Sequence, residues 1–109
     1  MTISYKILGQ SNPTANANVD LYAVPANTSV VASTLNICNQ ATSTGTFRIA
    51  VRPANATLAT KHYIAYDTAI PALDTISLTI GMSLAATDVV TIYTSSSSLS
   101  FNLFGSEIT

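Results

Sequence analysis

Apolar residues recur at every second position along most of this chain, and a period of two predicts β-strands. The clearest alternation lies in residues 75–80, and regular runs also cover residues 30–37, 47–52 and 98–103. Weaker runs cover residues 3–9, 20–24, 62–66 and 88–94. No stretch of useful length repeats at 3.6 residues, so the pattern indicates an all-β protein.

Polar loops and turns separate these runs, at residues 11–18, 25–27, 39–45 and 81–87 among others. About eight short strands at a spacing of about ten residues are typical of an antiparallel β-sandwich. A jelly-roll order and an immunoglobulin-like order both fit. A length of 109 residues predicts a single domain over residues 1–109.

Charged residues make up only 8% of the chain, against about a quarter in an ordinary globular domain. Ser, Thr and Asn take their place between the apolar positions, and such a surface loses little hydration when it is covered. This composition favours a packing component of an assembly over an enzyme. The net charge of −1 leaves no basic stripe for nucleic acid or for an anionic membrane.

The single cysteine, Cys38, predicts a chain without an internal disulfide, which is consistent with assembly in a reducing cytoplasm. The first residues lack the pattern of a signal peptide, and the apolar runs are too short for a transmembrane helix.

The strand positions opposite the expected core carry small and hydroxyl residues where an exposed sheet usually carries Lys and Glu. We expect these outward faces to include Ala32, Ala50 and Ala65, with Tyr22, Tyr63 and Phe104 as larger anchors. Small residues permit close approach, and tyrosine is favoured at interface centres. The candidate contact residues are Tyr22, Arg48, Arg52 and Tyr63. The alternatives are that Thr and Ser simply suit exposed strands and that both arginines lie on a solvated face.

The sequence contains no motif that groups the residue types used in catalysis. His62 is the only histidine, and no serine lies in a Gly-x-Ser-x-Gly elbow, so a hydrogen-bonded structural role is expected for His62. Cys38 has no nearby cation and is interpreted as a packing residue. Asp74 and Asp88 precede strands, where a turn-capping carboxylate is the ordinary role. The sequence therefore predicts no catalytic residue, no cofactor and no metal site.

Five segments carry a resemblance to known proteins: residues 5–10 (YKILGQ), 20–25 (DLYAVP), 46–53 (TFRIAVRP), 61–67 (KHYIAYD) and 99–108 (LSFNLFGSEI). Taken together, they resemble a group of small virion structural proteins of tailed phages, especially cyanophages. The resemblance covers almost the whole chain. It implies a non-enzymatic β-sandwich that is present on the virion in multiple copies, and it assigns no functional residue.

On this basis we expect a capsid decoration or cement protein, assembled in the host cytoplasm and located in the virion. Its partners would be the major capsid protein or other virion proteins, and copies of itself in clusters such as trimers. One alternative is a tail, neck, baseplate or fibre accessory protein. Another is a carbohydrate-binding module for the host surface, against which the absence of tryptophan counts.

Overall fold

The computed structural model describes residues 1–109 and contains nine strands and two single helical turns. The strands are β1 (Ile3–Ser11), β2 (Val19–Ala23), β3 (Ser29–Asn39), β4 (Gly45–Arg52), β5 (Tyr63–Ile70), β6 (Thr75–Leu78), β7 (Met82–Leu84), β8 (Val89–Thr94) and β9 (Leu99–Ile108). The helical turns are η1 (Pro53–Asn55) and η2 (Thr60–His62). No helix in the structure is long and apolar enough to cross a membrane.

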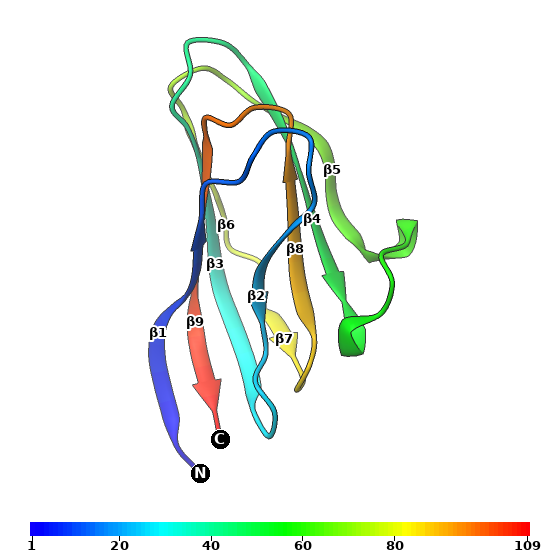
Figure 1. Ribbon diagram of the computed structural model, residues 1–109. Coiled ribbons are helices and arrows are strands. Elements are labelled where there is room, and N and C mark those ends of the chain that lie inside the picture. The colour runs from blue at the N-terminus through cyan, green and yellow to red at the C-terminus, as the bar shows by residue number, and fades with distance from the viewer.

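The strands form two antiparallel sheets that pack face to face (Figure 1). One sheet has the order β1-β9-β3-β6, with β7 also paired to β3, and the other has the order β2-β8-β4-β5. The predicted all-β sandwich is therefore confirmed. Successive strands mostly alternate between the two sheets, and this interleaved order is that of a jelly roll rather than of an immunoglobulin domain.

Strand β3 is a central strand of the first sheet and pairs along its length with β9 on one side. On its other side it pairs with β6 and then with β7, so these two short strands share one edge of the sheet. Gly81 separates them with a positive φ of 59°, a conformation that glycine adopts without strain. The hydrophobic pattern predicts only a link over residues 81–87, whereas Met82–Leu84 forms the short strand β7.

The core lies between the two sheets and contains one cluster of 15 buried apolar side chains. Near its centre Phe47 from β4 and Phe101 from β9 meet edge to face, with ring centroids 6.3 Å apart. Each fully buried Val, Leu, Ile or Phe side chain contributes about 1.5–3 kcal/mol relative to an exposed one. The alternating apolar positions of the sequence thus supply most of the stabilising burial.

A β-bulge in β3 overturns part of the expected assignment of faces. The period of two predicts that Val31 shares the inward face with Leu35, and that Ala32 points outward. In the structure Ala32 is fully buried and Val31 is 42% exposed. The register against β9 shifts between Ala32 and Thr34, so Ser33 is an extra residue that reverses the alternation.

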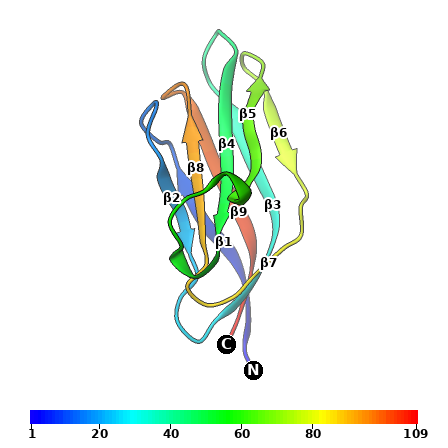
Figure 2. The same ribbon diagram turned by 90° about the vertical axis from the view of Figure 1, so that its right-hand side faces the viewer.

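The outer face of the second sheet is partly covered by the segment between β4 and β5, which crosses in front of the strands in Figure 2. This segment contains η1 and η2, and its last residue, His62, is buried. Ala50 of β4 and Thr91 of β8 are buried as well. The prediction that Ala50 lies on an exposed face is therefore wrong, because the segment that follows β4 folds back over the strand.

Candidate interaction surfaces

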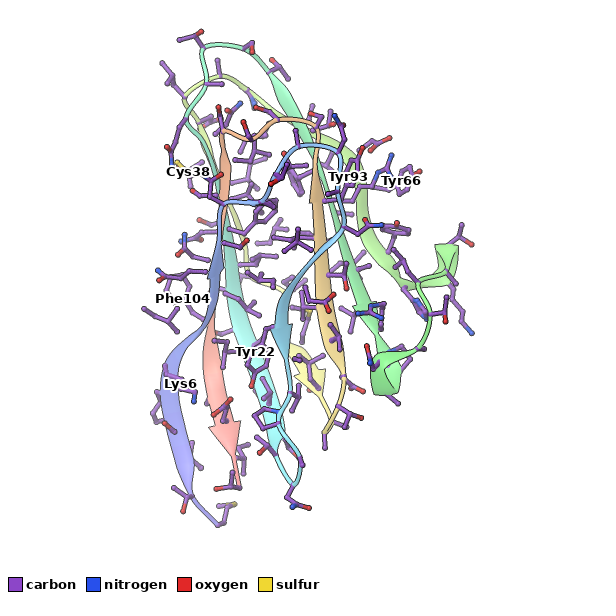
Figure 3. All side chains as sticks on the ribbon, viewed as in Figure 1. Lys6, Tyr22, Cys38, Tyr66, Tyr93 and Phe104 are labelled. Atoms are coloured by element: carbon purple, nitrogen blue, oxygen red, sulfur yellow. The ribbon has the colours of Figure 1, made fainter.

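The outer face of β1, β9 and β3 carries a group of exposed and half-buried apolar side chains. This apolar face consists of Tyr5, Ile7, Val31 and Phe104, of which Tyr5 is 83% and Ile7 52% exposed. A groove of about 470 Å³ lies here, with Tyr5, Val31 and Phe104 among its lining residues. Figure 3 shows Phe104 on the outer side of this sheet, away from the second sheet. Contiguous exposed apolar groups of this kind mark interaction sites.

Strand register explains how these side chains come together. Ile7 of β1 lies opposite Phe104 of β9, and Tyr5 lies opposite Ser106. The bulge at Ser33 turns Val31 outward beside them. Gly105 allows the strands to approach closely here, because a Cβ atom at this position would lie 2.3 Å from the Val31 carbonyl oxygen.

The few charged side chains are largely neutralised within the chain. Of four basic and five acidic residues, all but three take part in the ion pairs Lys6–Glu107, Arg48–Asp67 and Arg52–Asp20. Two of the remaining three cap turns: Asp88 accepts hydrogen bonds from the backbone N–H groups of Ala54 and Ala85, and Asp74 accepts one from Thr75. These contacts confirm the capping role predicted for both aspartates. Lys61 alone has no polar partner in the structure.

Arg48 lies at the centre of an aromatic cluster on the outer side of the second sheet. Its guanidinium carbon is 4.2 Å from the ring centroids of both Tyr66 and Tyr93. Its Nε donates to Asp67 Oδ1 at 2.6 Å, and this hydrogen bond raises the pKa of Arg48 further above its ordinary value. A bulge places Tyr66 and Asp67 of β5 together opposite Arg48, with Asp67 at a positive φ of 48°.

Arg52 lies four residues after Arg48 on β4. Its Nε donates to Thr91 Oγ1 at 2.9 Å, its Nη1 donates to the Ala56 carbonyl oxygen at 2.9 Å, and its Nη2 donates to Asp20 Oδ1 at 3.0 Å. The bond to Ala56 attaches the covering segment to the sheet, and the other two link β4 to β8 and β2. Both arginines predicted as contact residues are therefore engaged inside the chain.

Tyr22 does not lie on an outer face. Its ring packs against the core, and its hydroxyl donates a hydrogen bond to Glu107 of the opposite sheet, which also forms an ion pair with Lys6. Burial, followed by the bond to Glu107, raises the pKa of Tyr22 above its ordinary value. The hydrogen bonds from Lys6 and then Tyr22 lower the pKa of Glu107.

The structure thus separates the four predicted contact residues. Arg48, Arg52 and Tyr63 lie on the second sheet, where Tyr63 is half-buried and meets Tyr66 edge to face at 4.9 Å. Tyr22 lies between the sheets. Figure 3 shows Tyr66 and Tyr93 on the side opposite Phe104. Of the four residues of the apolar face, the sequence pattern predicted only Phe104 to point outward. The alternation of Ile3, Tyr5 and Ile7 in the first strand is a signal that could have identified this face.

His62 and Cys38, the residue types most often used in catalysis or metal binding, each have a structural setting. His62 is buried, and its Nδ1 accepts a hydrogen bond from the Ala59 N–H at 3.0 Å, as expected for a structural histidine. Cys38 is half-buried on β3 with a free thiol. No group of three or more His, Cys, Asp or Glu side chains is arranged to hold a metal ion.

Comparison with protein-family models, with curated proteins and with solved structures finds no match for this chain.

Proposed function

We propose that this chain is a structural protein of a phage particle, a decoration or cement protein that binds the capsid shell in many copies. Each copy buries a modest area against the shell, and repetition over the shell multiplies the stabilisation. The phage setting rests on the resemblance of five sequence segments to virion structural proteins. The structure contributes a candidate docking surface.

The observation that carries the proposal is the apolar face on β1, β9 and β3. Its side chains Tyr5, Ile7 and Val31 are each more than 40% exposed although they are apolar. The one nearby ionic group on β1, Lys6, is paired with Glu107. Covering such a surface removes apolar area from water without leaving a charge unpaired. We therefore assign the shell contact to this face rather than to Arg48 and Arg52, which already have carboxylate partners.

The jelly-roll order is compatible with this role, since domains of viral capsids and of lectins share it. Fold alone does not determine function, and the topology supports the proposal only by analogy.

Copy number provides the first test. The protein should be quantified against the major capsid protein in purified virions by stained bands or mass spectrometry. A decoration protein is expected at a ratio approaching one. A ratio far below unity, corresponding to a handful of copies, would contradict the proposal and favour the tail, neck, baseplate or fibre alternative.

A second test locates the contact surface. Val31→Asp places a charge on the apolar face, and we expect capsid shells lacking the protein to bind this variant at least about tenfold more weakly. Ile64→Asp is the matched control, because Ile64 is 49% exposed on β5 of the opposite sheet. Equal binding by both variants would contradict the assignment of the contact to this face.

The aromatic cluster on the second sheet favours one other candidate function, the binding of host-surface carbohydrate. Tyr66 and Tyr93 flank Arg48 and Tyr63 packs against Tyr66, and sugar rings stack on exposed aromatic side chains. Arg48, however, already occupies a face of both Tyr66 and Tyr93. Glycan-array binding that is lost in Tyr66→Ala and kept in Val31→Asp would favour this candidate over the decoration role.

A further inference from the structure

Strand β1 is an edge strand whose outer side has no partner. It lies at the end of the sheet order and pairs only with β9. Just before the strand, Thr2 and Thr109 exchange both backbone hydrogen bonds, at 2.8 and 2.9 Å. Hydrogen-bonded and non-hydrogen-bonded pairs alternate along an antiparallel ladder. Ser4 and Lys6 therefore bond to β9, and Ile3, Tyr5 and Ile7 direct their N–H and C=O groups to the free edge.

The same three residues carry the exposed apolar side chains of the strand. Because alternate residues share one face, Ile3, Tyr5 and Ile7 lie together on the outer side of the sheet. They are 45%, 83% and 52% exposed. An exposed apolar edge with free backbone groups is a template for a further strand.

We propose that this further strand is β1 of a second copy of the chain, paired antiparallel about a twofold axis at Tyr5. Residues 3–7 (ISYKI) match themselves in this register, because Ile3 lies opposite Ile7 of the second copy and Tyr5 lies opposite its own counterpart. These are the residues whose backbone groups face the free edge, so each of the three pairs exchanges both hydrogen bonds. The contact is isologous, as in most protein dimers, and joins the two β1-β9-β3-β6 sheets into one.

Lys6 does not oppose this pairing, although lysine on an edge strand often prevents one. Its side chain lies on the inner side, where it is paired with Glu107. In the proposed register Lys6 lies opposite Ser4 of the second copy, so the two lysines are not neighbours. The register shift between Ile7 and Gly9 ends the regular part of the edge, and this limits the pairing to residues 3–7.

The dimer is expected to be weak in isolation. A five-residue strand pair with flanking side chains buries less than a standard interface, so we expect a dissociation constant on the order of 100 µM. A high local concentration in an assembly would favour the pair. The pairing is nevertheless a property of the isolated chain, and it does not depend on the proposed function.

Sedimentation velocity of the full chain between about 10 µM and about 1 mM tests the proposal. The wild type should pass from monomer to dimer. Tyr5→Asp and Tyr5→Lys should each weaken the dimer at least about tenfold, because like charges then meet across the axis. An equimolar mixture of the two variants should restore it. Ile64→Asp, on an edge strand of the other sheet, should associate like the wild type.

Proline variants test the backbone geometry. Tyr5→Pro removes an N–H that faces the free edge, so the monomer should keep its thermal stability and lose the dimer. Lys6→Pro removes an N–H bonded to β9 and should destabilise the monomer itself. A wild type that stays monomeric at about 1 mM would overturn the proposal. So would a charge mixture that fails to associate or a dimer that persists in Tyr5→Pro. The capsid-binding comparison of Val31→Asp would stand in each case.

Discussion

At the scale of single residues, the cluster of Tyr22, Glu107 and Lys6 links the two sheets. Tyr22→Phe keeps the ring against the core and removes the hydroxyl that donates to Glu107. We expect the free energy of unfolding to fall by about 1.5 kcal/mol, as for other hydrogen bonds to a charged group, measured by urea denaturation at pH 7. Tyr93→Phe is the control, because its hydroxyl bonds only to Asn16 at the surface. Equal losses in both variants would contradict a special role for this part-buried cluster.

The same cluster predicts a dependence of stability on pH. The pKa of Glu107 in the folded chain lies below its unfolded value of about 4.3, so its stabilising contribution is complete above that value. The contribution is lost as the pH falls through the lowered pKa of the folded state. We expect urea midpoints to decrease as the pH falls below about 5, and to decrease less in Glu107→Gln. Parallel pH profiles for the two proteins would refute this.

A substitution of Ala50 tests the burial of the outer side of β4, which the hydrophobic period did not predict. It is fully buried beneath the segment that covers β4, so Ala50→Leu should overpack the site and lower the free energy of unfolding by about 1–3 kcal/mol. Ala69→Leu makes the same change at an exposed position of β5 and should cost less than about 0.5 kcal/mol. The free energies of unfolding of both variants are compared by thermal or urea denaturation. A small effect at Ala50 would mean that the covering segment does not pack on the strand.

At the scale of elements, bulges decide which side chains reach the surface. The extra residue Ser33 in β3 places Val31 on the outer face while Leu35 stays in the core. The bulge in β5 likewise brings Tyr66 and Asp67 together against Arg48. Bulges are not visible in a hydrophobic pattern, because they are set by pairing with a strand distant in sequence.

Deletion of Ser33 should therefore exchange the inward and outward side chains in one half of β3. Either Val30 and Ala32 or Leu35 and Ile37 would leave the core, and we expect a loss of more than about 3 kcal/mol or failure to fold. Ser33→Ala keeps the bulge and removes only a 3.3 Å hydrogen bond from Ser33 Oγ to the Phe104 carbonyl oxygen. It should change stability by less than about 0.5 kcal/mol. Circular dichroism and urea denaturation compare the two, and similar stabilities would show that the bulge does not control the register.

At the scale of the whole molecule, the two chain ends meet, as Figure 1 shows at the foot of the first sheet. Thr2 and Thr109 are hydrogen-bonded to each other, so a short linker can join the ends without distortion. A circular permutant opened between Thr42 and Ser43, in the exposed β3–β4 loop, should fold with a cooperative thermal transition.

The matched control opens the same linked chain between Leu103 and Phe104. This break falls inside β9, which lies between β1 and β3 in the sheet, and it should prevent folding. Near-ultraviolet circular dichroism and heteronuclear NMR spectra of both permutants provide the comparison. Folding of the second permutant would mean that the continuity of β9 is not required.

Much of the fold was predictable because strand formation depends on local pattern. Residues 75–80 predicted β6, and residues 47–52 predicted most of β4, since alternating burial acts within a few consecutive residues. The candidate surface was less predictable. Phe104 was expected at an outer face, whereas Tyr5 and Val31 were not identified, because their exposure depends on an edge position and on a bulge.

The alternation of apolar with hydroxyl residues dictates strands, turns, a two-layer core and a surface of few charges, since each follows from the chemistry of neighbouring residues. The order of strands, the inward position of Tyr22, the pairing of six of the nine charged residues and the free edge of β1 follow from contacts between residues far apart in sequence. Such contacts depend on which strands become neighbours when the sheets close. The local pattern therefore assigns a residue to a strand. The pairing of strands that are distant in sequence decides whether its side chain faces the core, a neighbouring strand or the solvent.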